Sequence, residues 1–375
     1  MKVAYIGIKG LPAKAGVDRV VEAIATRMPS LGITPTIYCD RDCTLEDISF
    51  PGVELKRISS LRGKYFHAPT GFINAALHAV ISGKYDIIHL HNIEASFVLP
   101  ILRIKYPVVS TAHGFAYWRE KWAPSAKWLI RMMDWPFMKF SNVTTFVSRK
   151  DADEFSKRFG QHTVYIPNGV GFEYQPDLNR AKTILNQHGL KPDSYFIFVA
   201  GRIEPTKGAH LAIEAVNRLE AEIPLLVVGD DQQIPAYGKK LKEIAGTKIR
   251  FHPLVNDAGA LFGLLACAKC LLFPSFAEAM SMVLLEAASV GLPVICSDLA
   301  ENRQVMENDA LYFNSGNVES LIEQIQISLD RPSWIKEMGQ RAMKRIREDY
   351  SWDAISVQYA GIYKDIITGM KKSGR

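Results

Sequence analysis

The chain has 375 residues, about twice the length of an ordinary single domain, so we expect two domains. Hydrophobic residues make up 48% of it and charged residues 22%, which excludes a disordered or fibrous protein. The formal net charge of +6 is mildly basic and suits anionic partners such as nucleotides or a membrane surface, without identifying any of them. Five cysteines without the spacing of a secreted scaffold favour a reduced, cytoplasmic setting.

The chain begins MKVAYIGIKG, an apolar run too short for a signal peptide, which we interpret as a first strand. No run of about eighteen apolar residues, the length that spans a bilayer, occurs in the sequence. The longest candidate, Ala258–Phe273, is interrupted by Lys269. We therefore expect any contact with a membrane to be peripheral, at the inner face of the cell membrane.

Short apolar runs alternate with longer amphipathic stretches through the first half of the chain. Two of these stretches, Gly16–Leu31 and Ala68–Ser82, have the length and pattern of helices. Strands that alternate with such helices predict a parallel sheet covered on both faces. The expected strands are Val3–Gly7, Thr34–Cys39, Val53–Ile58, Asp86–Leu90, Val108–Thr111 and Thr144–Val147.

A linker is predicted at Ile166–Val170, because Pro167 fixes the chain direction and Asn168-Gly169 tolerates a left-handed turn. This divides the chain into an N-terminal domain, 1–168, and a C-terminal domain, 171–350. The linker is also the expected hinge between them.

The second half repeats the alternation of strands and helices. Its expected strands are Tyr195–Ala200, Leu225–Gly229, Ile249–Phe251, Leu271–Pro274, Val294–Ser297 and Leu311–Phe313. The chain ends in one long helix, about 352–372, with Ser351 at its N-cap. This helix is expected to cross back and pack against the first domain. The expected fold is α/β, with two doubly wound parallel sheets facing a central cleft, where ligands bind beyond the carboxyl ends of the strands.

The segment Phe273–Asp298 carries the strongest functional signal. It reads as a strand, a loop with Glu278, a helix with Glu286 and a second strand. We expect Glu286 two turns beyond Glu278 along the same helix side, so that both carboxylates can accept hydrogen bonds from sugar hydroxyls. The amide groups of the helix start, at Met280, Ser281, Met282 and Val283, suit a phosphate or hydroxyl oxygen. For either glutamate alone, an ordinary solvated helix charge would be the better interpretation.

A second signal, Gly201-Arg202-Ile-Glu-Pro-Thr-Lys207-Gly208, follows the strand that ends at Ala200. Arg202 and Lys207 at a strand-to-helix turn can both reach a diphosphate. The guanidinium binds it bidentately and the ammonium binds it as a point charge. Basic residues at turns are common, so this motif is only moderately specific by itself.

Together the two segments resemble the family 4 glycosyltransferases, which have two Rossmann-like domains in the GT-B arrangement. The Glu-x7-Glu motif of that family matches Glu278 and Glu286, and its Gly-Arg…Lys-Gly motif matches Arg202 and Lys207. The resemblance covers almost the whole chain, and it includes the His113-Gly114 pair, the Pro-Asn-Gly-Val linker and the tryptophan of the last helix.

The resemblance implies a retaining transfer of sugar from a nucleoside-diphosphate sugar to a saccharide or lipid-linked acceptor. By this likeness Glu278 contacts the donor sugar and Glu286 the ribose, while Arg202 and Lys207 neutralise the departing diphosphate. His113 is similar to the histidine that faces the donor sugar from the acceptor-side N-terminal domain. An ordinary histidine at a strand end is the competing interpretation.

Two positions depart from the pattern of the family. The Gly-Gly run that opens its first long helix is here Ala15-Gly16, and a glycine that commonly follows the first glutamate is here Ala279. Gly16 is expected to let the backbone approach the donor phosphate. The added methyl groups bear on donor geometry and sugar identity more than on activity.

No metal and no cofactor are expected, because the cations already present can stabilise the diphosphate. The acidic pairs Asp40-x-Asp42 and Asp151-x-Asp153 both lie in the first domain, away from the donor segments. Other pairs of metal-ligating type are interpreted as structural. They are His89 and His91, Cys39 and Cys43, and Cys267 and Cys270.

The stretch 117–135 holds four of the six tryptophans among basic residues. Two interpretations stay open: an interfacial surface for anionic headgroups, or ordinary packing against the first domain. The residues in question are Trp118, Lys121, Trp122, Lys127 and Arg131. The stretch also resembles a segment of a rhamnosyltransferase-like branch that builds cell-surface polysaccharides.

Three functions from different classes stay open at this point. An active glycosyltransferase is favoured over a non-catalytic subunit that binds nucleotide sugars, because all the matched charged residues and His113 are intact. A nucleotide-sugar epimerase of the GT-B type is the third. A nicotinamide dehydrogenase is disfavoured, because Val227-Val-Gly-Asp230 and the first loop lack the Gly-x-Gly-x-x-Gly fingerprint. Nucleic acid is not an expected partner.

Overall fold

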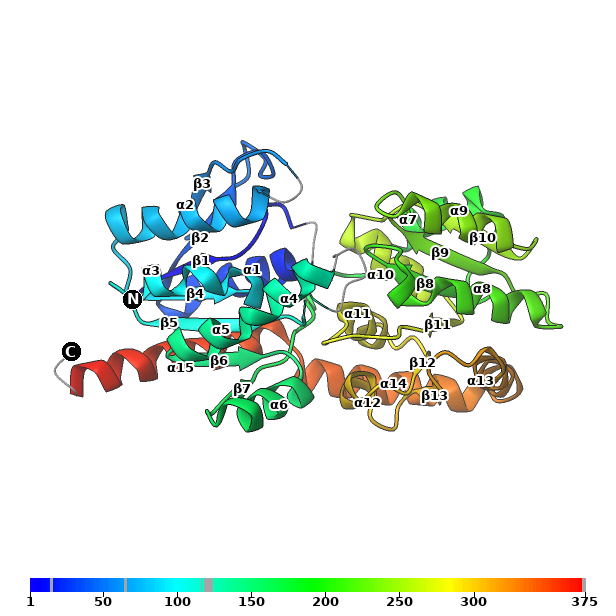
Figure 1. Cartoon of the computed structure of the whole chain (residues 1–375). Coiled ribbons are helices and arrows are strands. Elements are labelled where there is room, and N and C mark those ends of the chain that lie inside the picture. The colour runs from blue at the N-terminus through cyan, green and yellow to red at the C-terminus, as the bar shows by residue number, and fades with distance from the viewer. Residues whose placement is uncertain (14–15, 64–65, 116, 118–123, 373–375) are drawn as a thin grey trace. The chain divides into compact units, whose positions relative to one another are not determined.

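The computed structural model describes residues 1–375 except 14–15, 64–65, 116, 118–123 and 373–375. The chain forms two compact units, one of Met1–Gly169 with Trp352–Arg375 and one of Val170–Ser351 (Figure 1). Their boundary falls inside the segment 166–170, for which the sequence predicts a linker. The hinge expected there stays a prediction.

The first unit is built on a seven-stranded sheet in which every neighbouring pair is parallel. The spatial order is β3-β2-β1-β4-β5-β6-β7. The six predicted strands of this half are confirmed to within about one residue at each end. The strands are β1 (Lys2–Ile6), β2 (Thr34–Asp40), β3 (Glu54–Ile58), β4 (Ile87–His91), β5 (Val108–Ala112), β6 (Val143–Phe146) and β7 (Val164–Tyr165).

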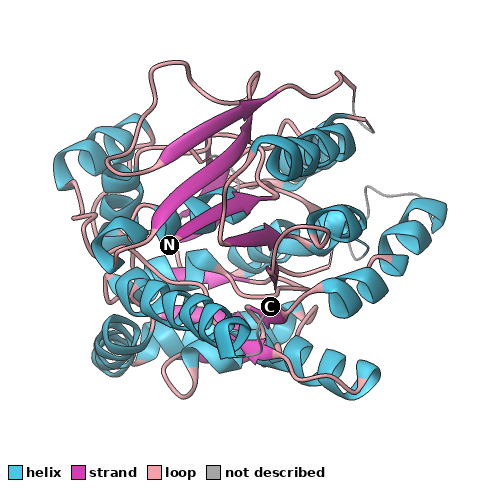
Figure 2. Ribbon diagram, turned by 90° about the vertical axis from the view of Figure 1, so that its left-hand side faces the viewer, coloured by secondary structure: helices cyan, strands magenta, loops and turns pink. Residues whose placement is uncertain are grey.

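Helices cover both faces of this sheet, as the strand pattern predicts (Figure 2). They are α1 (Gly16–Ala25), η1 (Met28–Leu31), α2 (His67–Ser82), η2 (Ile93–Val98), α3 (Leu99–Leu102), α4 (Pro124–Met132), α5 (Asp134–Phe140) and α6 (Arg149–Phe159). The single helix expected over 16–31 is wrong in one respect, because it breaks after Ala25. Pro29 has no N–H for an α-helical bond, so the chain continues as the short 3-10 helix η1.

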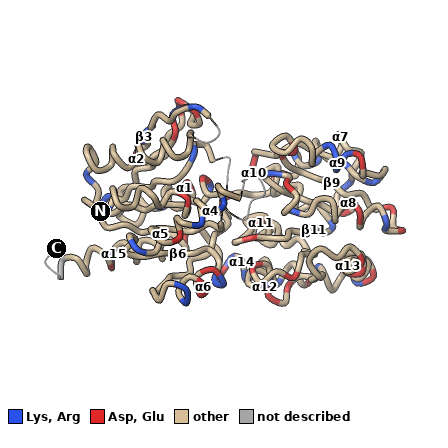
Figure 3. Tube along the Cα trace, viewed as in Figure 1, with Lys and Arg blue, Asp and Glu red and all other residues tan. Residues whose placement is uncertain are grey.

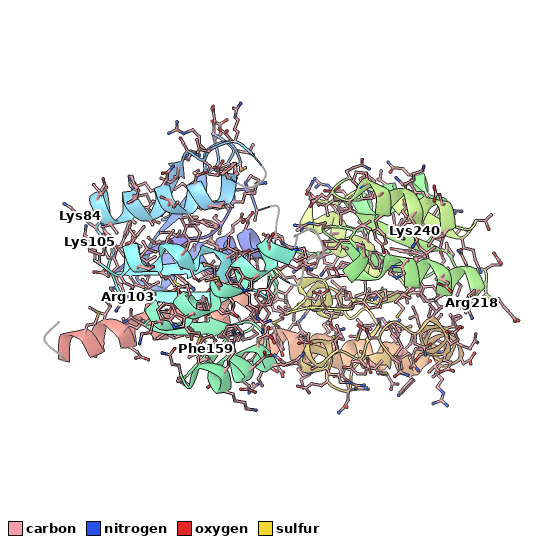
Figure 4. The ribbon with its side chains drawn as sticks, in the orientation of Figure 1. Lys84, Arg103, Lys105, Phe159, Arg218 and Lys240 are labelled. Atoms are coloured by element: carbon pink, nitrogen blue, oxygen red, sulfur yellow. The ribbon has the colours of Figure 1, made fainter. Side chains whose placement is uncertain are left out.

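The carboxyl end of helix α2 contacts Lys105, which lies in the connection between α3 and β5. Lys105 Nζ lies 2.9 Å from the carbonyl oxygens of both Val80 and Gly83 and donates to them. Figure 4 shows Lys105 beside Lys84 and Arg103 at one end of the first unit. A cation at the carboxyl end of a helix stabilises the exposed carbonyl groups there.

The last helix, α15 (Trp352–Lys372), belongs to the first unit, as the sequence predicts. Its buried face inserts Ile355, Tyr359 and Tyr363 into the core of that unit. Arg27 Nε donates to Asp353 Oδ1 at 2.8 Å, which ties α15 to the end of α1.

The second unit has a six-stranded parallel sheet of order β10-β9-β8-β11-β12-β13. Its first three strands run outward in one direction and the next three in the other, so the order reverses between β8 and β11, as in a doubly wound fold. All six strands were predicted to within one residue at each end. They are β8 (Phe196–Ala200), β9 (Leu225–Gly229), β10 (Ile249–His252), β11 (Cys270–Phe273), β12 (Val294–Ser297) and β13 (Leu311–Phe313).

The core of the second unit forms because the strands β8, β9, β11 and β12 are buried along their whole length. Near-continuous apolar strands of this kind require helices on both faces. These helices are α7 (Leu178–Gln187), η4 (Pro205–Lys207), α8 (Ala209–Arg218), α9 (Pro235–Ile244), α10 (Ala258–Cys267), α11 (Met282–Ser289), α12 (Ala300–Met306), α13 (Val318–Asp330) and α14 (Pro332–Asp349).

No helix in the described part of the chain is both long enough and apolar enough to cross a membrane.

Candidate functional site

The strand order of the second unit reverses between β8 and β11, and the loops that follow these two strands carry the predicted donor residues. The loop after β8 holds Arg202 and ends in the 3-10 helix with Lys207. The loop after β11 holds Glu278 and leads into α11. Ligands of doubly wound sheets bind at such a reversal, beyond the carboxyl ends of the strands.

The structure brings Lys207 and Glu278 together. Lys207 Nζ lies 2.7 Å from Glu278 Oε1, and the glutamate side chain is only 8% exposed. Residues 71 positions apart thus form an ion pair between the two loops. A partly buried pair of this kind holds both groups in a defined geometry and strengthens their hydrogen bond.

A glycine determines how closely the two loops approach. Gly208 has φ +73°, and a Cβ atom on it would lie 2.0 Å from the carbonyl oxygen of Pro274. The amide N–H of Phe276 also donates to the carbonyl oxygen of Thr206 at 2.8 Å. Any larger residue at Gly208 would push the loops apart, and it would separate Lys207 from Glu278.

Arg202 lies in the same loop with most of its hydrogen-bonding capacity unused. Its Nη1 is 3.8 Å from Glu204 Oε2, a long ion pair, and its buried Nε has no hydrogen-bond partner among the described residues. The side chain is 32% exposed. A guanidinium with unused N–H donors, in the same loop as the Lys207 ammonium, is suited to a diphosphate, which can accept several charge-assisted hydrogen bonds.

Glu278 and Glu286 do not lie along one side of a helix, and this expectation is wrong. Glu278 is in the loop, four residues before α11 begins at Met282, so helical spacing does not relate it to Glu286. Glu286 lies inside α11 and is 2% exposed, which also excludes the interpretation of a solvated charge. The sequence placed the helix start too early because Met280 and Ser281 continue the apolar pattern of the helix.

The four residues expected to offer amide groups straddle the start of α11. Met280 and Ser281 precede the helix and are buried, with Ser281 at the N-cap position. Met282 and Val283 form its first turn, whose amide groups donate no hydrogen bond to the Ser281 side chain. Such amides carry the positive end of the helix dipole. Ala279 has no left-handed backbone conformation, so its methyl group fits without strain.

In the first unit the loop after β1 is fixed to the helix that follows it. The amide of Lys9 donates to Asp18 Oδ1 at 3.0 Å, and the amide of Ala13 donates to Glu22 Oε2 at 2.9 Å. A Cβ atom on Gly16, the first residue of α1, would meet no described atom within 4 Å, so the structure shows no close approach that requires glycine there. Ala15 lies outside the described residues.

His113 follows β5 and is half-buried at the carboxyl edge of the sheet. Its Nε2 is 2.9 Å from Nδ1 of His91, and its buried Nδ1 has no hydrogen-bond partner among the described residues. Burial lowers the pKa of His113 to about 3, so its imidazole is neutral at physiological pH. The contact with His91 was missed by sequence reasoning, although the alternation of His89 and His91 placed both rings on one face.

His89 is a fully bonded core histidine, as expected for a structural role. Its Nδ1 is 2.7 Å from the Tyr363 hydroxyl and its Nε2 is 2.6 Å from Thr111 Oγ1. With both nitrogens occupied, it has no lone pair to offer a metal.

The described residues contain one group with the spacing of metal ligands: Asp40, Cys43 and His67, whose ligand atoms all lie within 4.8 Å of one another. The sequence analysis considered Cys43 together with Cys39 rather than with Asp40 and His67, and it interpreted both cysteines as structural. The Asp40 carboxylate is already engaged, since it accepts from the hydroxyl of Ser60 and pairs with His67 Nε2 at 3.4 Å. The Asp40 carboxylate thus already has partners in Ser60 and His67.

The basic, tryptophan-rich stretch is described only in part, because Trp118, Lys121 and Trp122 lie outside the described residues. None of the residues of α4 is buried. Four large apolar side chains of α4 and α5 are about half exposed or more, and Arg131 is exposed beside them, while Lys127 is half-buried. They are Trp128 (66%), Leu129 (57%), Met132 (47%) and Trp135 (56%). This face of α4 is therefore not core packing.

Charged residues of both signs are spread over each unit, so neither unit is a uniformly basic surface (Figure 3).

Two parallel doubly wound sheets, with charged residues collected at the strand-order reversal of the second, define a protein of the GT-B fold class. Two family models match the chain: Glycosyltransferase Family 4 over residues 15–174 and Glycosyl transferases group 1 over residues 181–345. The chain belongs to the family 4 glycosyltransferases, and it is a glycosyltransferase.

Curated relatives and solved structures agree with this assignment. The chain is 26% identical to a UDP-Gal:alpha-D-GlcNAc-diphosphoundecaprenol alpha-1,3-galactosyltransferase of Escherichia coli, over 86% of both chains. Its fold is similar to sucrose-phosphate synthase of Thermosynechococcus elongatus, with TM-score 0.82, 18% identity and 98% and 99% of the two chains covered. It is also similar to HepE of Anabaena in complex with UDP-glucose, with TM-score 0.79, 16% identity and 97% and 100% covered.

Proposed function

We propose that this glycosyltransferase transfers a sugar from a nucleoside-diphosphate sugar to a saccharide or lipid-linked saccharide, with retention of configuration at the anomeric carbon. The observation that carries the proposal is the Lys207–Glu278 ion pair, with Arg202, whose buried Nε has no partner among the described residues, in the same loop as Lys207. These three groups can bind a sugar hydroxyl and a diphosphate at one place, the reversal of strand order in the second unit.

Each group has a role in that reaction. Glu278 accepts a hydrogen bond from a hydroxyl of the donor sugar, and Glu286 from the ribose. Arg202 and Lys207 stabilise the negative charge that develops as the bond between the anomeric carbon and the phosphate oxygen breaks. The departing phosphate takes the proton of the acceptor hydroxyl as the new glycosidic bond forms on the same face. By the family resemblance, His113 and Gly16 of the first unit also take part in binding the donor.

The test is transfer itself. The purified protein is incubated with a panel of nucleotide sugars, and the donor is identified by the rise in melting temperature that a bound ligand causes by mass action. Transfer is then measured with saccharide and lipid-linked acceptors. Product formed only with an acceptor supports the proposal, whereas isomerisation of the sugar without an acceptor would indicate an epimerase. Binding without either reaction would indicate a non-catalytic subunit.

We expect transfer to survive EDTA, because two cationic side chains already face the place where the diphosphate would lie. Activity is compared before and after chelation, and again after addition of magnesium, manganese or zinc. An activity that EDTA abolishes and a metal restores would contradict the proposal. If a metal does restore activity, the variant Cys43→Ala tests whether the Asp40–Cys43–His67 group binds that metal, since it removes one member of the group.

The acceptor proposed is one of cell-surface polysaccharide synthesis, presented at the cytoplasmic face of a membrane. The Escherichia coli relative is named for an acceptor linked to diphosphoundecaprenol, a lipid. Exposed Trp128 on α4 and Trp135 on α5, together with Lys127 and Arg131 on α4, have the composition of a surface that lies in the interface of an anionic bilayer. A rhamnosyl donor, which the stretch around α4 suggests, belongs to the same proposal.

Replacing Trp128 and Trp135 together by alanine should weaken binding to anionic vesicles by about tenfold or more, because each exposed indole loses its burial in the interface. Salt should weaken binding of the wild type too, since headgroup attraction is screened over about 10 Å at moderate ionic strength. Co-sedimentation measures both effects. The matched control is Trp334→Ala, a tryptophan of the second unit that is 41% exposed. Equal binding by the double variant and the wild type would refute the membrane surface.

A further inference from the structure

The helix α2 has a composition that is rare on a protein surface. Its 16 residues include no Asp, Glu, Lys or Arg. The side that is buried against the rest of the unit is formed by the small residues Ala75, Ala76 and Ala79. A surface helix ordinarily directs large apolar residues toward the core and charged residues toward water. In α2 the buried side is small and the exposed side is uncharged.

The exposed side of α2 carries a row of aliphatic side chains. Ile73, Leu77 and Ile81 are 37%, 41% and 77% exposed, and residues four apart lie one above another along a helix. Ile104, in the connection between α3 and β5, is 77% exposed as well. Its neighbour Lys105 donates to carbonyl groups at the carboxyl end of α2. The apolar row therefore continues past the end of the helix.

The helix α2 belongs to a layer that also includes α3, α5 and α4 on one face of the sheet (Figure 1). Within it α2 contacts α3, α3 contacts α5, and α5 contacts α4. The large apolar side chains that this layer exposes are Ile73, Leu77, Ile81, Ile104, Trp128, Leu129, Met132 and Trp135. On the opposite face, the described parts of α1, η1 and α15 expose one such side chain, Val357.

The exposed charges of the layer are basic. They are Lys84, Arg103, Lys105, Arg131 and Lys139, with Lys127 half-buried. The acids near them are turned to other uses or withdrawn from water. Asp134 of α5 is 1% exposed, and Glu94 of η2 is half-buried. Asp86, in the connection between α2 and β4, accepts a hydrogen bond from the amide of Lys2 at 2.6 Å.

This combination ends at the borders of the layer. The helix α6, joined to α5 by the ion pair of Arg158 with Asp134, exposes both acids and bases, such as Glu154 and Lys157. The helix α15, on the opposite face, likewise exposes charges of both signs. Rows of exposed apolar side chains with charges of one sign are thus particular to α2, α3, α5 and α4.

Charge decides what covers this surface. In a two-fold dimer the same patch would meet itself, and its basic groups would face basic groups without exposed acids to pair with them. An anionic bilayer offers phosphates to the basic groups and an apolar interior to the aliphatic and indole side chains. We propose that the layer α2–α3–α5–α4 docks on an anionic membrane, with α2 lying in the plane of the interface and its row Ile73–Leu77–Ile81 inserted.

This docking surface is wider than the tryptophan-bearing face of α4 and α5, and its centre is a helix without any charge. Its evidence comes from α2 and the helices beside it. That the membrane carries the lipid-linked acceptor rests on the proposed function, whereas the attraction to anionic lipid does not.

Co-sedimentation with vesicles of phosphatidylglycerol and phosphatidylcholine tests the part of α2. The double variant Ile81→Gln, Ile104→Gln should bind about tenfold more weakly or worse, because two side chains lose their burial in the interface. Both are exposed in the free protein, so the melting temperature should be unchanged. The matched control is Val357→Gln on α15, an aliphatic side chain that is 55% exposed. It should bind as the wild type does.

A second pair of variants tests the charges. Lys84→Gln with Lys139→Gln should weaken binding and reduce its dependence on salt, because two attractions to headgroups are lost. The control Lys364→Gln removes an exposed lysine of α15 and should change neither. Vesicles of phosphatidylcholine alone should bind the wild type much more weakly than the mixed vesicles do.

The outcomes separate this surface from its alternatives. Wild-type binding by the Ile81→Gln, Ile104→Gln variant overturns the proposal even if loss of Trp128 and Trp135 weakens binding, because the surface is then confined to α4 and α5. Equal binding to vesicles with and without phosphatidylglycerol overturns it too. A dimer in sedimentation equilibrium that this variant disrupts would show that a second copy covers the face. If the wild type binds as expected but transfers no sugar, the proposed function fails and the docking surface stands.

Discussion

Replacing Glu278 by Gln or Lys207 by Ala should lower kcat/KM for glycosyl transfer by about a hundredfold to a thousandfold. The two groups form one ion pair at 2.7 Å, and each variant removes a charge to which the proposed function assigns the sugar or its leaving group. Removing a single preorganised group that stabilises charge in a transition state costs about this much. Transfer to an acceptor is measured with the donor that the thermal-shift panel identifies.

The fold should survive both changes, because the pair lies in loops at the edge of the sheet rather than in the core. Gln at position 278 still accepts from Lys207, and the lysine side chain, at 27% exposed, keeps contact with water. The matched control is Arg218→Ala, which breaks an exposed pair of the same unit, Arg218 with Glu319 at 2.9 Å. It should leave transfer unchanged. Turnover close to wild type in either site variant, at unchanged melting temperature, would refute the site.

The strands could be predicted from sequence because they are short apolar runs between turn residues. Long-range pairs could not be predicted with the same certainty. Lys207 and Glu278 were each singled out from a motif, but their contact depends on two facts about the chain in space. β8 and β11 are neighbours in the sheet, and Gly208 lets the two loops meet at the carbonyl of Pro274.

The errors also have physical causes. The sequence put the start of the helix at Met280, whereas the backbone is not helical until Met282, so Glu278 in the loop before it is not related to Glu286 by helical spacing. The amphipathic stretch 16–31 keeps its period past Ala25, but Pro29 cannot continue an α-helix.

The contact between His91 and His113 could not be predicted for a different reason. The two rings are 22 residues apart, at the ends of neighbouring strands, and no local pattern in the sequence reports that contact. The signal that could have found it is the register of two parallel strands whose ends both carry histidine.

Acid should unfold the first unit well above the range in which carboxylates titrate. Three of its histidines are kept neutral by burial: the pKa values of His89 and His91 lie well below 6.5, and that of His113 is about 3. In the unfolded chain each ring titrates near 6.5. Below that pH the unfolded state binds protons that the folded state does not bind, so stability is fully present above pH 6.5 and falls as the pH drops.

The expected loss is large. For a histidine whose folded pKa is about 3, as for His113, the free energy of unfolding falls by about 2 kcal/mol between pH 7 and pH 5, and the lowered pKa values of His89 and His91 act in the same direction. The total stability of a domain is typically about 5–15 kcal/mol, so a loss of this kind from buried rings is enough to shift acid unfolding to higher pH. Urea titrations at a series of pH values measure the effect. Tryptophan fluorescence reports mainly on the first unit, which holds all the tryptophans except Trp334.

Variants separate the buried rings from other groups that titrate. His91→Asn removes one proton-binding site from the unfolded chain, so its stability should fall less between pH 7 and pH 5 than that of the wild type, whatever its stability at pH 7. The control is His162→Gln, which changes an exposed ring of the same unit and should not reduce the dependence as His91→Asn does. A wild-type stability that stays level from pH 7 to pH 5 would show that the three rings take up protons in the folded protein as they do in the unfolded chain, so that burial does not lower their pKa values.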